Sequence, residues 1–362
     1  MAERTVVIVG ATGSIGGQTL DVLRKLKGFE LVGFTYHRNE SKAIEIKKIF
    51  PRARAVSTVD SLKRAVELVE ELRPDVTVVA IPGFSGFEVS YHIIPFTKRL
   101  ALANKESLVC GGRFIKERAK DSETEIIPID SEHSATFQLL QGERTVEKIA
   151  ITASGGALRD YPLEKLKNAK PEDVLKHPVW KMGAKVTVDS ATMVNKALEV
   201  LEAMELFSLK REQVEVFVHR EGKIHAMVFL KDGTVKIHAS VPDMRIPIAY
   251  SLTYPERTYE NPDFPDLSLL RFERPQRERY PLFFLVDEIH NSYALRTAYN
   301  AADEVAVEAF LEGKIKFTDI HKVVEKTLNR IDSAEPSSPE ELKEIDKKSR
   351  RIAEEVIGCC LK

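Results

Sequence analysis

The 362-residue sequence has few cysteines, almost no net charge and no long apolar run. Its three cysteines, Cys110, Cys359 and Cys360, suit neither a disulfide framework nor a zinc knuckle. With 54 Lys and Arg against 55 Asp and Glu, no charge excess favours nucleic acid or an anionic membrane surface. No segment resembles a signal peptide or a membrane span. We therefore expect a cytoplasmic protein that binds neither nucleic acid nor membranes.

The first glycines of the chain stand where a predicted strand meets a predicted helix. An apolar run precedes Gly10, and apolar residues recur at helical spacing after Ile15. Glycines here let the backbone approach a pyrophosphate, whose charge the first amides of the helix can hold. The spacing is G-x-x-G-x-x-G rather than G-x-G-x-x-G, so a plain turn is the alternative. We assign cofactor contacts to Gly10, Thr12, Gly13, Ser14, Ile15 and Gly16.

The end of the second predicted strand indicates which dinucleotide is bound. A protein that selects NAD usually carries an acid there, which bonds the ribose 2′-hydroxyl. This strand ends instead in His37, Arg38 and Asn39. Because Arg38 could pair with a 2′-phosphate, we expect NADPH, with contacts from Arg38 and Asn39. A solvated basic loop is the alternative.

Strand-like runs at 76–82, 99–104 and 125–130 alternate with helical patterns. This alternation predicts a doubly wound, Rossmann-like parallel sheet with ligands at the carboxyl ends of its strands. Asn104, Lys105 and Glu106 follow one such end and are expected to contact the cofactor. A surface lysine that opens a helix is the alternative for Lys105.

Four polar residues follow the next strand end: Asp130, Ser131, Glu132 and His133. If this segment is extended, Asp130 and Glu132 share one face. Two carboxylates that close repel each other unless a cation or a basic group lies between them. The cluster therefore predicts a positive partner.

The stretch from Lys185 to Phe207 is expected to form a short strand, a capping Asp or Ser, and a helix. On that helix Asn195, Lys196 and Glu199 fall along one edge. A surface ion pair between Lys196 and Glu199 is the alternative.

A second group of polar residues predicts an anion site. Ser154 ends a strand and is followed by two glycines, a backbone that can fold around an anion. Together with Ser190, Asn195 and Lys196, it would bind a phosphate at a helix N-terminus. Between these residues lies the only tryptophan, Trp180. Because Pro178 and Gly183 bracket Trp180, we expect a lid, with a core tryptophan as the alternative.

Six motifs identify a known family: GATGSIG, ANKESLV, PIDSEHSATFQ, ITASGGALRD, HPVWKMGAKVTVDSATMVNKALE and NAADEVAVEAFL. They occur in the order found in 1-deoxy-D-xylulose 5-phosphate reductoisomerases, which the chain resembles over nearly its whole length. The resemblance implies an NADPH-dependent oxidoreductase of non-mevalonate isoprenoid biosynthesis. Such an enzyme isomerises and reduces the sugar phosphate 1-deoxy-D-xylulose 5-phosphate to 2-C-methyl-D-erythritol 4-phosphate.

The resemblance also implies roles for individual residues. Asp130, Glu132 and Glu199 become ligands of one divalent cation, Mg²⁺ or Mn²⁺, with Co²⁺ as a further option. Oxygen ligands of this kind suit a hard metal. Catalytic roles pass to Lys105, Glu132 and His177. The implied substrate-binding residues are Ser131, Ser154, His177, Trp180, Met182, Ser190, Asn195 and Lys196.

The chain departs from the family pattern at YHRN after the second strand and at PGFSGF after the fourth, both near the cofactor. Asp303 stands where many members carry Asn. The main alternative is an NADP-dependent dehydrogenase of another phosphorylated small substrate. A thioester-forming semialdehyde dehydrogenase is excluded, because no cysteine lies between Cys110 and Cys359. A non-catalytic NADPH sensor would have no need of the three acids.

The remaining sequence suggests how the chain is organised. Three strand-like segments between residues 214 and 240 predict an antiparallel meander, which a homodimer could cover. Ser338, Pro339 and Glu341 mark the start of a last helix. We therefore expect an α/β protein with an NADPH-binding domain (1–129), an α+β central catalytic and dimerisation domain (130–254), a connector (255–280) and a small C-terminal helical domain (281–362).

Overall fold

The computed structural model describes residues 3–176, 179–180 and 182–360. The chain forms two compact units. The first comprises Met1–Ser107, Arg113–Ala135 and Asp243–Asp263, and the second comprises Leu108–Gly112, Thr136–Pro242 and Phe264–Lys362. The domain boundaries expected from the sequence stay predictions.

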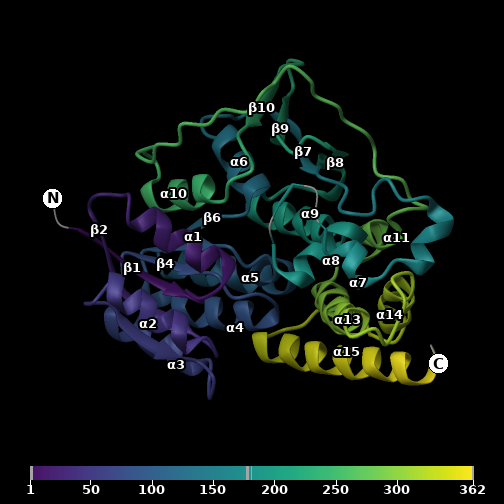
Figure 1. Cartoon of the computed structure of the whole chain (residues 1–362), viewed down its shortest axis with the longest axis horizontal. Coiled ribbons are helices and arrows are strands. Elements are labelled where there is room, and N and C mark those ends of the chain that lie inside the picture. The colour runs from purple at the N-terminus through teal and green to yellow at the C-terminus, as the bar shows by residue number, and fades with distance from the viewer. Residues whose placement is uncertain (1–2, 177–178, 181, 361–362) are drawn as a thin grey trace. The chain divides into compact units, whose positions relative to one another are not determined.

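A six-stranded parallel sheet with the order β3-β2-β1-β4-β5-β6 forms the centre of the first unit (Figure 1). Every residue of β4 is buried, as expected for a parallel strand that helices cover on both faces. The doubly wound sheet predicted from the sequence is confirmed. Its strands are β1 (Arg4–Val9), β2 (Phe29–Tyr36), β3 (Arg54–Ser57), β4 (Val76–Val79), β5 (Arg99–Leu102) and β6 (Glu125–Pro128).

Helices connect these strands, and one helix from far along the chain completes the core of this unit. Ile248 and Leu252 of α10 (Arg245–Thr253) are fully buried in the same core as Leu20 of α1. The burial of these side chains holds α10 against α1. The connecting helices are α1 (Ser14–Leu23), α2 (Glu40–Ile49), α3 (Lys63–Leu72), α4 (Phe84–Ile93), the 3-10 helix η1 (Ile94–Phe96), α5 (Glu106–Asp121) and α6 (Ser131–Leu139).

The second unit contains a four-stranded sheet with the order β10-β9-β7-β8. Its strands are β7 (Val146–Ala153), β8 (Val214–Val218), β9 (Ile224–Leu230) and β10 (Val235–Ala239). β9 and β10 form the expected antiparallel hairpin. The predicted meander is wrong at β8, which pairs in parallel with β7 instead of with β9. Residues 149–153 of β7 are buried, so this strand occupies an inner position with a partner on each side.

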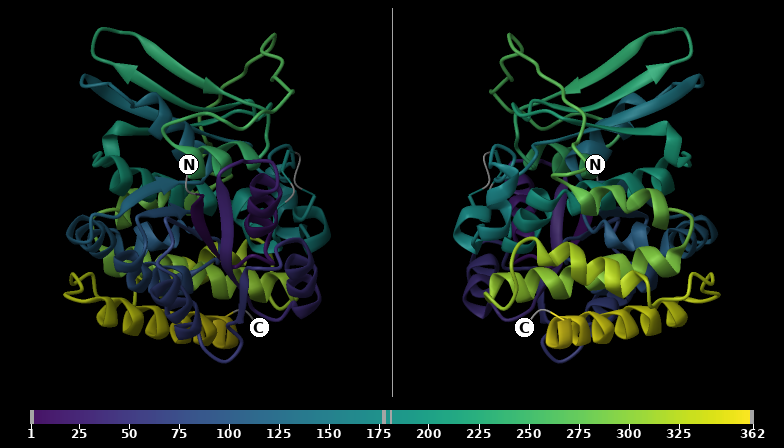
Figure 2. Two further views of the ribbon diagram at one scale, coloured as in Figure 1. Left: turned by 90° about the vertical axis from the view of Figure 1, so that its left-hand side faces the viewer. Right: turned by 90° about the vertical axis from the view of Figure 1, so that its right-hand side faces the viewer.

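The rest of the second unit is helical. In Figure 2, α15 (yellow) lies alongside α13 and α14, and the three helices pack on one another. The Ser338 side chain accepts a bond from the Glu341 amide at 3.3 Å, which confirms the predicted helix start. The helices are η2 (Leu163–Asn168), α7 (Pro171–Val174), α8 (Ala184–Thr192), α9 (Val194–Phe207), η3 (Arg211–Gln213), α11 (Pro281–Phe284), α12 (Val286–Ile289), α13 (Tyr293–Leu311), α14 (Asp319–Leu328) and α15 (Pro339–Cys360).

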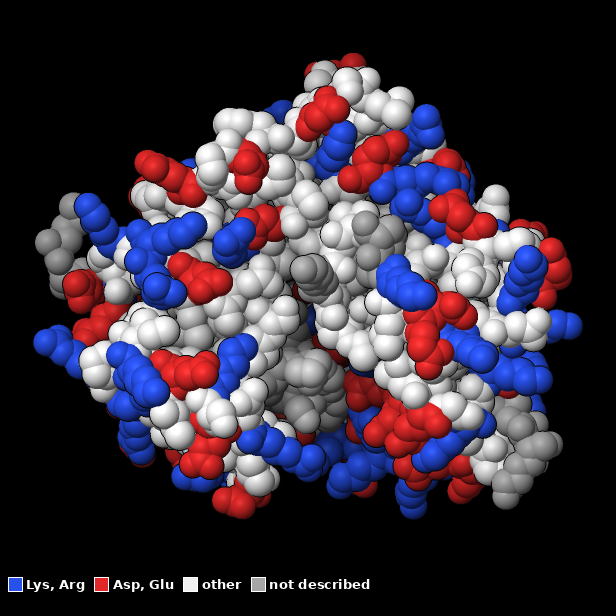
Figure 3. All heavy atoms as spheres, in the orientation of Figure 1, with Lys and Arg blue, Asp and Glu red and all other residues white. Residues whose placement is uncertain are grey.

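Charged side chains of both signs are interspersed over the face shown in Figure 3, in keeping with a net charge near zero. Among the described residues, no helix combines the length and the apolar character that crossing a bilayer requires.

Candidate functional site

The glycine turn after β1 brings the backbone of α1 close to the sheet. A Cβ at Gly16 would lie 2.5 Å from the Ala11 Cα, so only glycine allows this approach. Gly10 has φ +92° and its amide donates to the Thr35 hydroxyl at 2.9 Å. The N-cap residue, Gly13, forms no side-chain cap bond, which leaves amides of the first turn of α1 for a ligand. The predicted cofactor turn therefore has the geometry of an anion site.

The end of β2 presents the basic corner predicted from the sequence. His37, Arg38 and Asn39 are exposed, and the Asn39 side chain caps α2 by accepting from the Lys42 amide at 3.0 Å. The Lys42 Nζ donates to the Thr12 carbonyl at 2.9 Å, which ties α2 to the glycine turn. Sequence reasoning missed Lys42, although its position three residues after a helix cap places it on the same side of the helix as Asn39.

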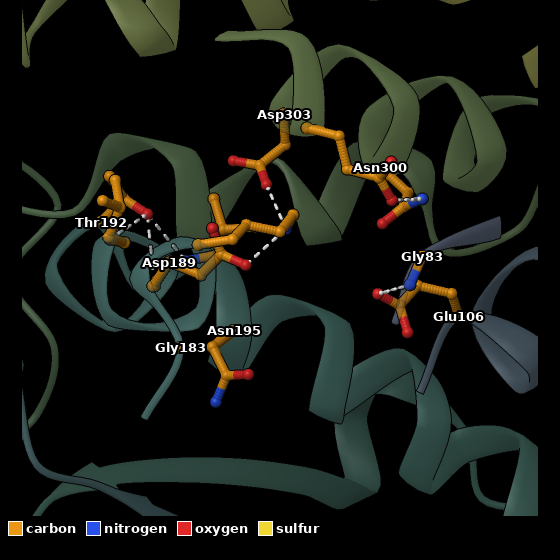
Figure 4. A network of polar contacts seen from close by, with 12 residues as sticks. Gly83, Glu106, Gly183, Asp189, Thr192, Asn195, Asn300 and Asp303 are labelled. Atoms are coloured by element: carbon orange, nitrogen blue, oxygen red, sulfur yellow. Dashed lines mark hydrogen bonds and ion pairs between the residues drawn. The ribbon is translucent and has the colours of Figure 1, made fainter. Parts of the chain in front are cut away.

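Asn104 and Glu106 hold the loop that follows β4. The buried Asn104 Nδ2 lies 3.0 Å from the Ile81 carbonyl and 2.7 Å from the Glu106 Oε2. The Glu106 Oε1 accepts from the Gly83 amide at 2.9 Å (Figure 4). A Cβ at Gly86 would lie 2.5 Å from the Asn104 Oδ1. These two predicted cofactor residues therefore fix the shape of the loop that would form the wall of the cofactor site.

The acidic cluster after β6 forms a helix start, which corrects the extended segment expected from the sequence. Asp130 lies just before α6 and its Oδ1 accepts from the amides of Glu132 at 3.2 Å and His133 at 3.4 Å. The same oxygen lies 2.8 Å from the His133 Nδ1. Lys105 donates to the other oxygen of Asp130, and Ser131 donates to Glu132. Asp130 thus has basic partners in Lys105 and His133. A positive partner between the two carboxylates stays a prediction.

Ser154 and Ser190, which lie far apart in the chain, come together in the second unit. Their Oγ atoms are 3.5 Å apart. Ser154 follows β7, and its Oγ accepts from the Gly156 amide at 3.2 Å. Ser190 lies on α8, so the short strand and the capping Asp or Ser predicted for this stretch are wrong. Helix α8 ends at Thr192, and the left-handed backbone of Met193 (φ +60°) separates it from α9.

Asn195, Lys196 and Glu199 form a buried cluster on α9. Asn195 donates to one oxygen of Glu199 and Lys196 to the other. The relative exposure of Lys196 is 3% and that of Glu199 is 1%, so the alternative of a surface ion pair is wrong. Removing two such charges from water costs several kcal/mol each, which favours a site that binds ligands over a purely structural pair.

The expected lid is only partly described. His177 lies outside the described residues. Trp180 and Met182 are half-buried, and the Trp180 ring lies 6.2 Å from the His225 ring of β9. The lid itself stays a prediction.

The sequence did not predict a third polar group, in which the half-buried Lys185 bonds two buried acids, Asp189 and Asp303, both labelled in Figure 4. Lys185 donates to Asp189 one turn along α8 and to Asp303 of α13 at 2.9 Å. Burial, followed by the charge of Asp303, raises the pKa of Asp189 well above its usual value, while Lys185 opposes the shift. The spacing of Lys185 and Asp189 is the helical i, i+4 signal, which the expectation of a strand concealed.

Protein-family models match most of the chain. The model described as 1-deoxy-D-xylulose 5-phosphate reductoisomerase matches residues 6–73 and 52–112. Two models of the C-terminal domain of the same enzyme match residues 126–207 and 239–352.

Relatives and solved structures agree with these models. The chain is 54% identical over 368 residues to the 1-deoxy-D-xylulose 5-phosphate reductoisomerase of Thermotoga neapolitana and 53% identical over 371 residues to that of Thermotoga maritima, with 98% of both chains covered in each case. The Zymomonas mobilis enzyme in complex with NADPH matches with a TM-score of 0.88 and 35% identity, over 99% of this chain and 100% of that chain. A crystal structure of DOX-P reductoisomerase with NADPH, fosmidomycin and magnesium matches with a TM-score of 0.90 and 31% identity over 98% of each chain. The chain described here belongs to the 1-deoxy-D-xylulose 5-phosphate reductoisomerase family.

Proposed function

We propose that this chain converts 1-deoxy-D-xylulose 5-phosphate to 2-C-methyl-D-erythritol 4-phosphate by isomerisation followed by reduction with NADPH. The observation that carries the proposal is the buried cluster on α9. There a carboxylate, an ammonium and an amide share one helix edge, on the helix that follows the Ser154–Ser190 pair. A sugar phosphate offers an anion for the basic and hydroxyl groups and oxygens for a metal.

The cation ligands are Asp130, Glu132 and Glu199. Asp130 and Glu132 lie at the start of α6 in the first unit, and Glu199 lies on α9 in the second unit. Asp130 and Glu199 each accept a bond from a lysine, so a positive group already lies beside each of these acids. All three supply oxygen, the ligand that Mg²⁺ and Mn²⁺ prefer. When bound, the ion would act as a Lewis acid toward substrate oxygens.

The phosphate of the substrate would bind Ser154, Ser190, Asn195 and Lys196. Hydroxyl, amide and ammonium groups all donate hydrogen bonds to phosphate oxygens, and those to a charged acceptor are the stronger kind. A grip on the phosphate orients the reacting carbons without touching them. We assign Ser131 to the remainder of the substrate, and Trp180 and Met182 to a lid that excludes water.

The first unit would hold the cofactor. The open amides of α1 bind the pyrophosphate, and Arg38 contacts the 2′-phosphate at the end of β2. NADPH supplies the hydride when bound. Lys105 donates to Asp130 and so places a positive group beside the acids. It lies next to the cofactor contact Asn104 and before the metal ligands in the sequence, and would contact both cofactor and substrate.

The activity is tested by mixing the chain with NADPH, Mg²⁺ and 1-deoxy-D-xylulose 5-phosphate and following the absorbance of reduced nicotinamide. Glu199→Gln is expected to abolish metal-dependent turnover while NADPH still binds, as measured by nucleotide fluorescence. Glu205→Gln is the matched control, because Glu205 is a buried acid of the same helix that bonds Arg296 at 2.7 Å and Tyr293 at 2.8 Å. Wild-type turnover in Glu199→Gln would contradict the ligand assignment. Turnover without any divalent metal would favour a simple NADP-dependent dehydrogenase.

We further propose a homodimer that forms through the sheet of the second unit. β10 is an edge strand, and its Val235 and Ile237 are exposed. Phe264, in the irregular segment after α10, is 88% exposed. Exposed strand edges and apolar side chains are commonly covered by a partner. Light scattering that reports a monomer at micromolar concentration would contradict the dimer. A cytoplasmic location stays a prediction.

A further inference from the structure

Tyr280 occupies an unusual position relative to the loop that carries Ser154. It lies immediately before α11, far along the chain from β7, and only 3% of the residue is exposed. Its hydroxyl donates to the Gly155 carbonyl at 2.9 Å. A side chain from a distant segment thus holds the peptide group between Gly155 and Gly156.

The loop has little other freedom. Gly155 and Gly156 both have left-handed backbones, with φ +82° and +71°. Arg159 donates to the Ser154 carbonyl at 2.9 Å, so the carbonyls of Ser154 and Gly155 both accept from side chains. Fixing these two carbonyls also fixes the Gly156 amide, which donates to the Ser154 Oγ at 3.2 Å.

The hydroxyl of Tyr280 remains a donor over the whole working pH range. Burial raises the pKa of Tyr280 to about 12, against the opposing influence of Arg279, Arg159 and Arg220. A phenol that stays protonated at neutral pH can donate this bond to the Gly155 carbonyl.

We infer that Tyr280 is a positioning residue for the phosphate site. Its hydroxyl sets the orientation of the peptide between Gly155 and Gly156, whose amide bonds the Ser154 Oγ, and through it the distance between the Ser154 and Ser190 hydroxyls. This inference rests on the proposed function, because it takes the serine pair as the phosphate contact. Tyr280 itself touches no reacting atom in this scheme.

Tyr280→Phe tests the inference by removing only the hydroxyl. We expect KM for the sugar phosphate to rise roughly 3- to 10-fold, the effect of one lost buried hydrogen bond, with kcat and KM for NADPH little changed. The inhibition constant of inorganic phosphate should rise by the same factor, which a purely structural role would not produce. Arg159→Gln removes the companion bond to the Ser154 carbonyl and is expected to act in the same direction, so the test survives if Tyr280→Phe does not fold.

Tyr299→Phe is the matched control. Tyr299 is also a buried tyrosine of the second unit, and its hydroxyl donates to a backbone carbonyl, that of Leu282, at 3.1 Å. Its loss should lower stability to a similar degree and leave KM and phosphate inhibition unchanged. The inference is overturned if Tyr280→Phe leaves KM and the phosphate inhibition constant at wild-type values while Ser154→Ala raises them. It is also overturned if Tyr280→Phe and Tyr299→Phe raise these constants equally. Failure of the wild-type chain to turn over the sugar phosphate would contradict the proposed function instead.

Discussion

Replacing Gly156 with alanine would place a methyl group where α8 meets the loop after β7. A Cβ at this position would lie 2.5 Å from the Ala191 Cα, 2.6 Å from the Ser190 carbonyl oxygen and 2.7 Å from the Ala191 amide nitrogen. All three are backbone atoms, so no side-chain rotation can relieve the overlap. The change therefore forces apart the two segments that carry Ser154 and Ser190.

Two effects add at Gly156, backbone strain and overpacking. A substitution at a second glycine, Gly313, measures the backbone strain alone. The left-handed backbone (φ +71°) costs alanine about 1–2 kcal/mol. Overpacking adds a further ~1–3 kcal/mol. Gly313, between α13 and α14, has φ +72°, and a Cβ added there would meet no atom within 4 Å, so Gly313→Ala carries the backbone cost alone.

The displacement predicts the catalytic effect. Restoring an ordinary contact of at least 3.4 Å from 2.5 Å requires the loop and the helix to separate by about 0.9 Å. A misplacement of this size can lower the rate by about 100-fold, so we expect kcat/KM for Gly156→Ala to fall by roughly 10- to 100-fold, mainly through KM. For Gly313→Ala we expect wild-type kinetics.

The assay combines urea unfolding, followed by circular dichroism, with steady-state kinetics on both variants. The expected result is a larger loss of stability for Gly156→Ala than for Gly313→Ala, by about 1–3 kcal/mol, together with a kinetic defect confined to Gly156→Ala. Equal losses of stability in the two variants, with unchanged KM in both, would refute the reasoning, because the added methyl group would then be accommodated without moving the serine pair.

Three further predictions concern charge. The pKa of Asp189 is raised in the folded state, so its contribution to stability is complete below its usual pKa of 3.8 and is lost as pH rises through the folded pKa. Asp189→Asn keeps the bond between Lys185 and Asp303 and should flatten that fall in plots of unfolding midpoint against pH. Arg38→Ala should weaken NADPH binding about 10- to 100-fold with NADH binding unchanged, and equal losses for the two nucleotides would contradict the 2′-phosphate contact. Because Lys196 donates to Glu199 in the structure, removing Mg²⁺ should lower the affinity for inorganic phosphate by about 5-fold or more in calorimetry, and no change on chelation would show that the two ligands bind independently.

Local patterns were sufficient to predict the parallel sheet of the first unit. Alternating apolar strands and amphipathic helices specify a doubly wound sheet, and a glycine turn after its first strand specifies where an anion binds. Gly16 meets the backbone of Ala11 within one short turn, so the information that selects glycine lies within a few residues of it.

The errors arose where distant contacts determine the local structure. The run of β-branched residues after Lys185 favours a strand, yet α8 is a helix in which Lys185 bonds Asp303, 118 residues away. Similarly, β8 pairs with β7 rather than with its neighbour in sequence, β9. The segment after β6 was ambiguous for another reason, because an acid that follows a strand can either continue it or cap a helix, and Asp130 caps α6.

The energetics of α9 connect its sequence to its function. A helix selected for stability alone would carry apolar side chains at buried positions, since replacing a buried ion pair with apolar residues of similar volume is often neutral or stabilising by about 1–4 kcal/mol. Lys196 and Glu199 are instead almost completely buried and are bonded to each other, in a cluster with Asn195. A cation bound to Glu199 would take the place of the Lys196 ammonium, and a phosphate bound to Lys196 would take the place of the Glu199 carboxylate. Under the proposed function, the helix gives up stability in the free protein and holds two opposite charges in place for the cation and the phosphate.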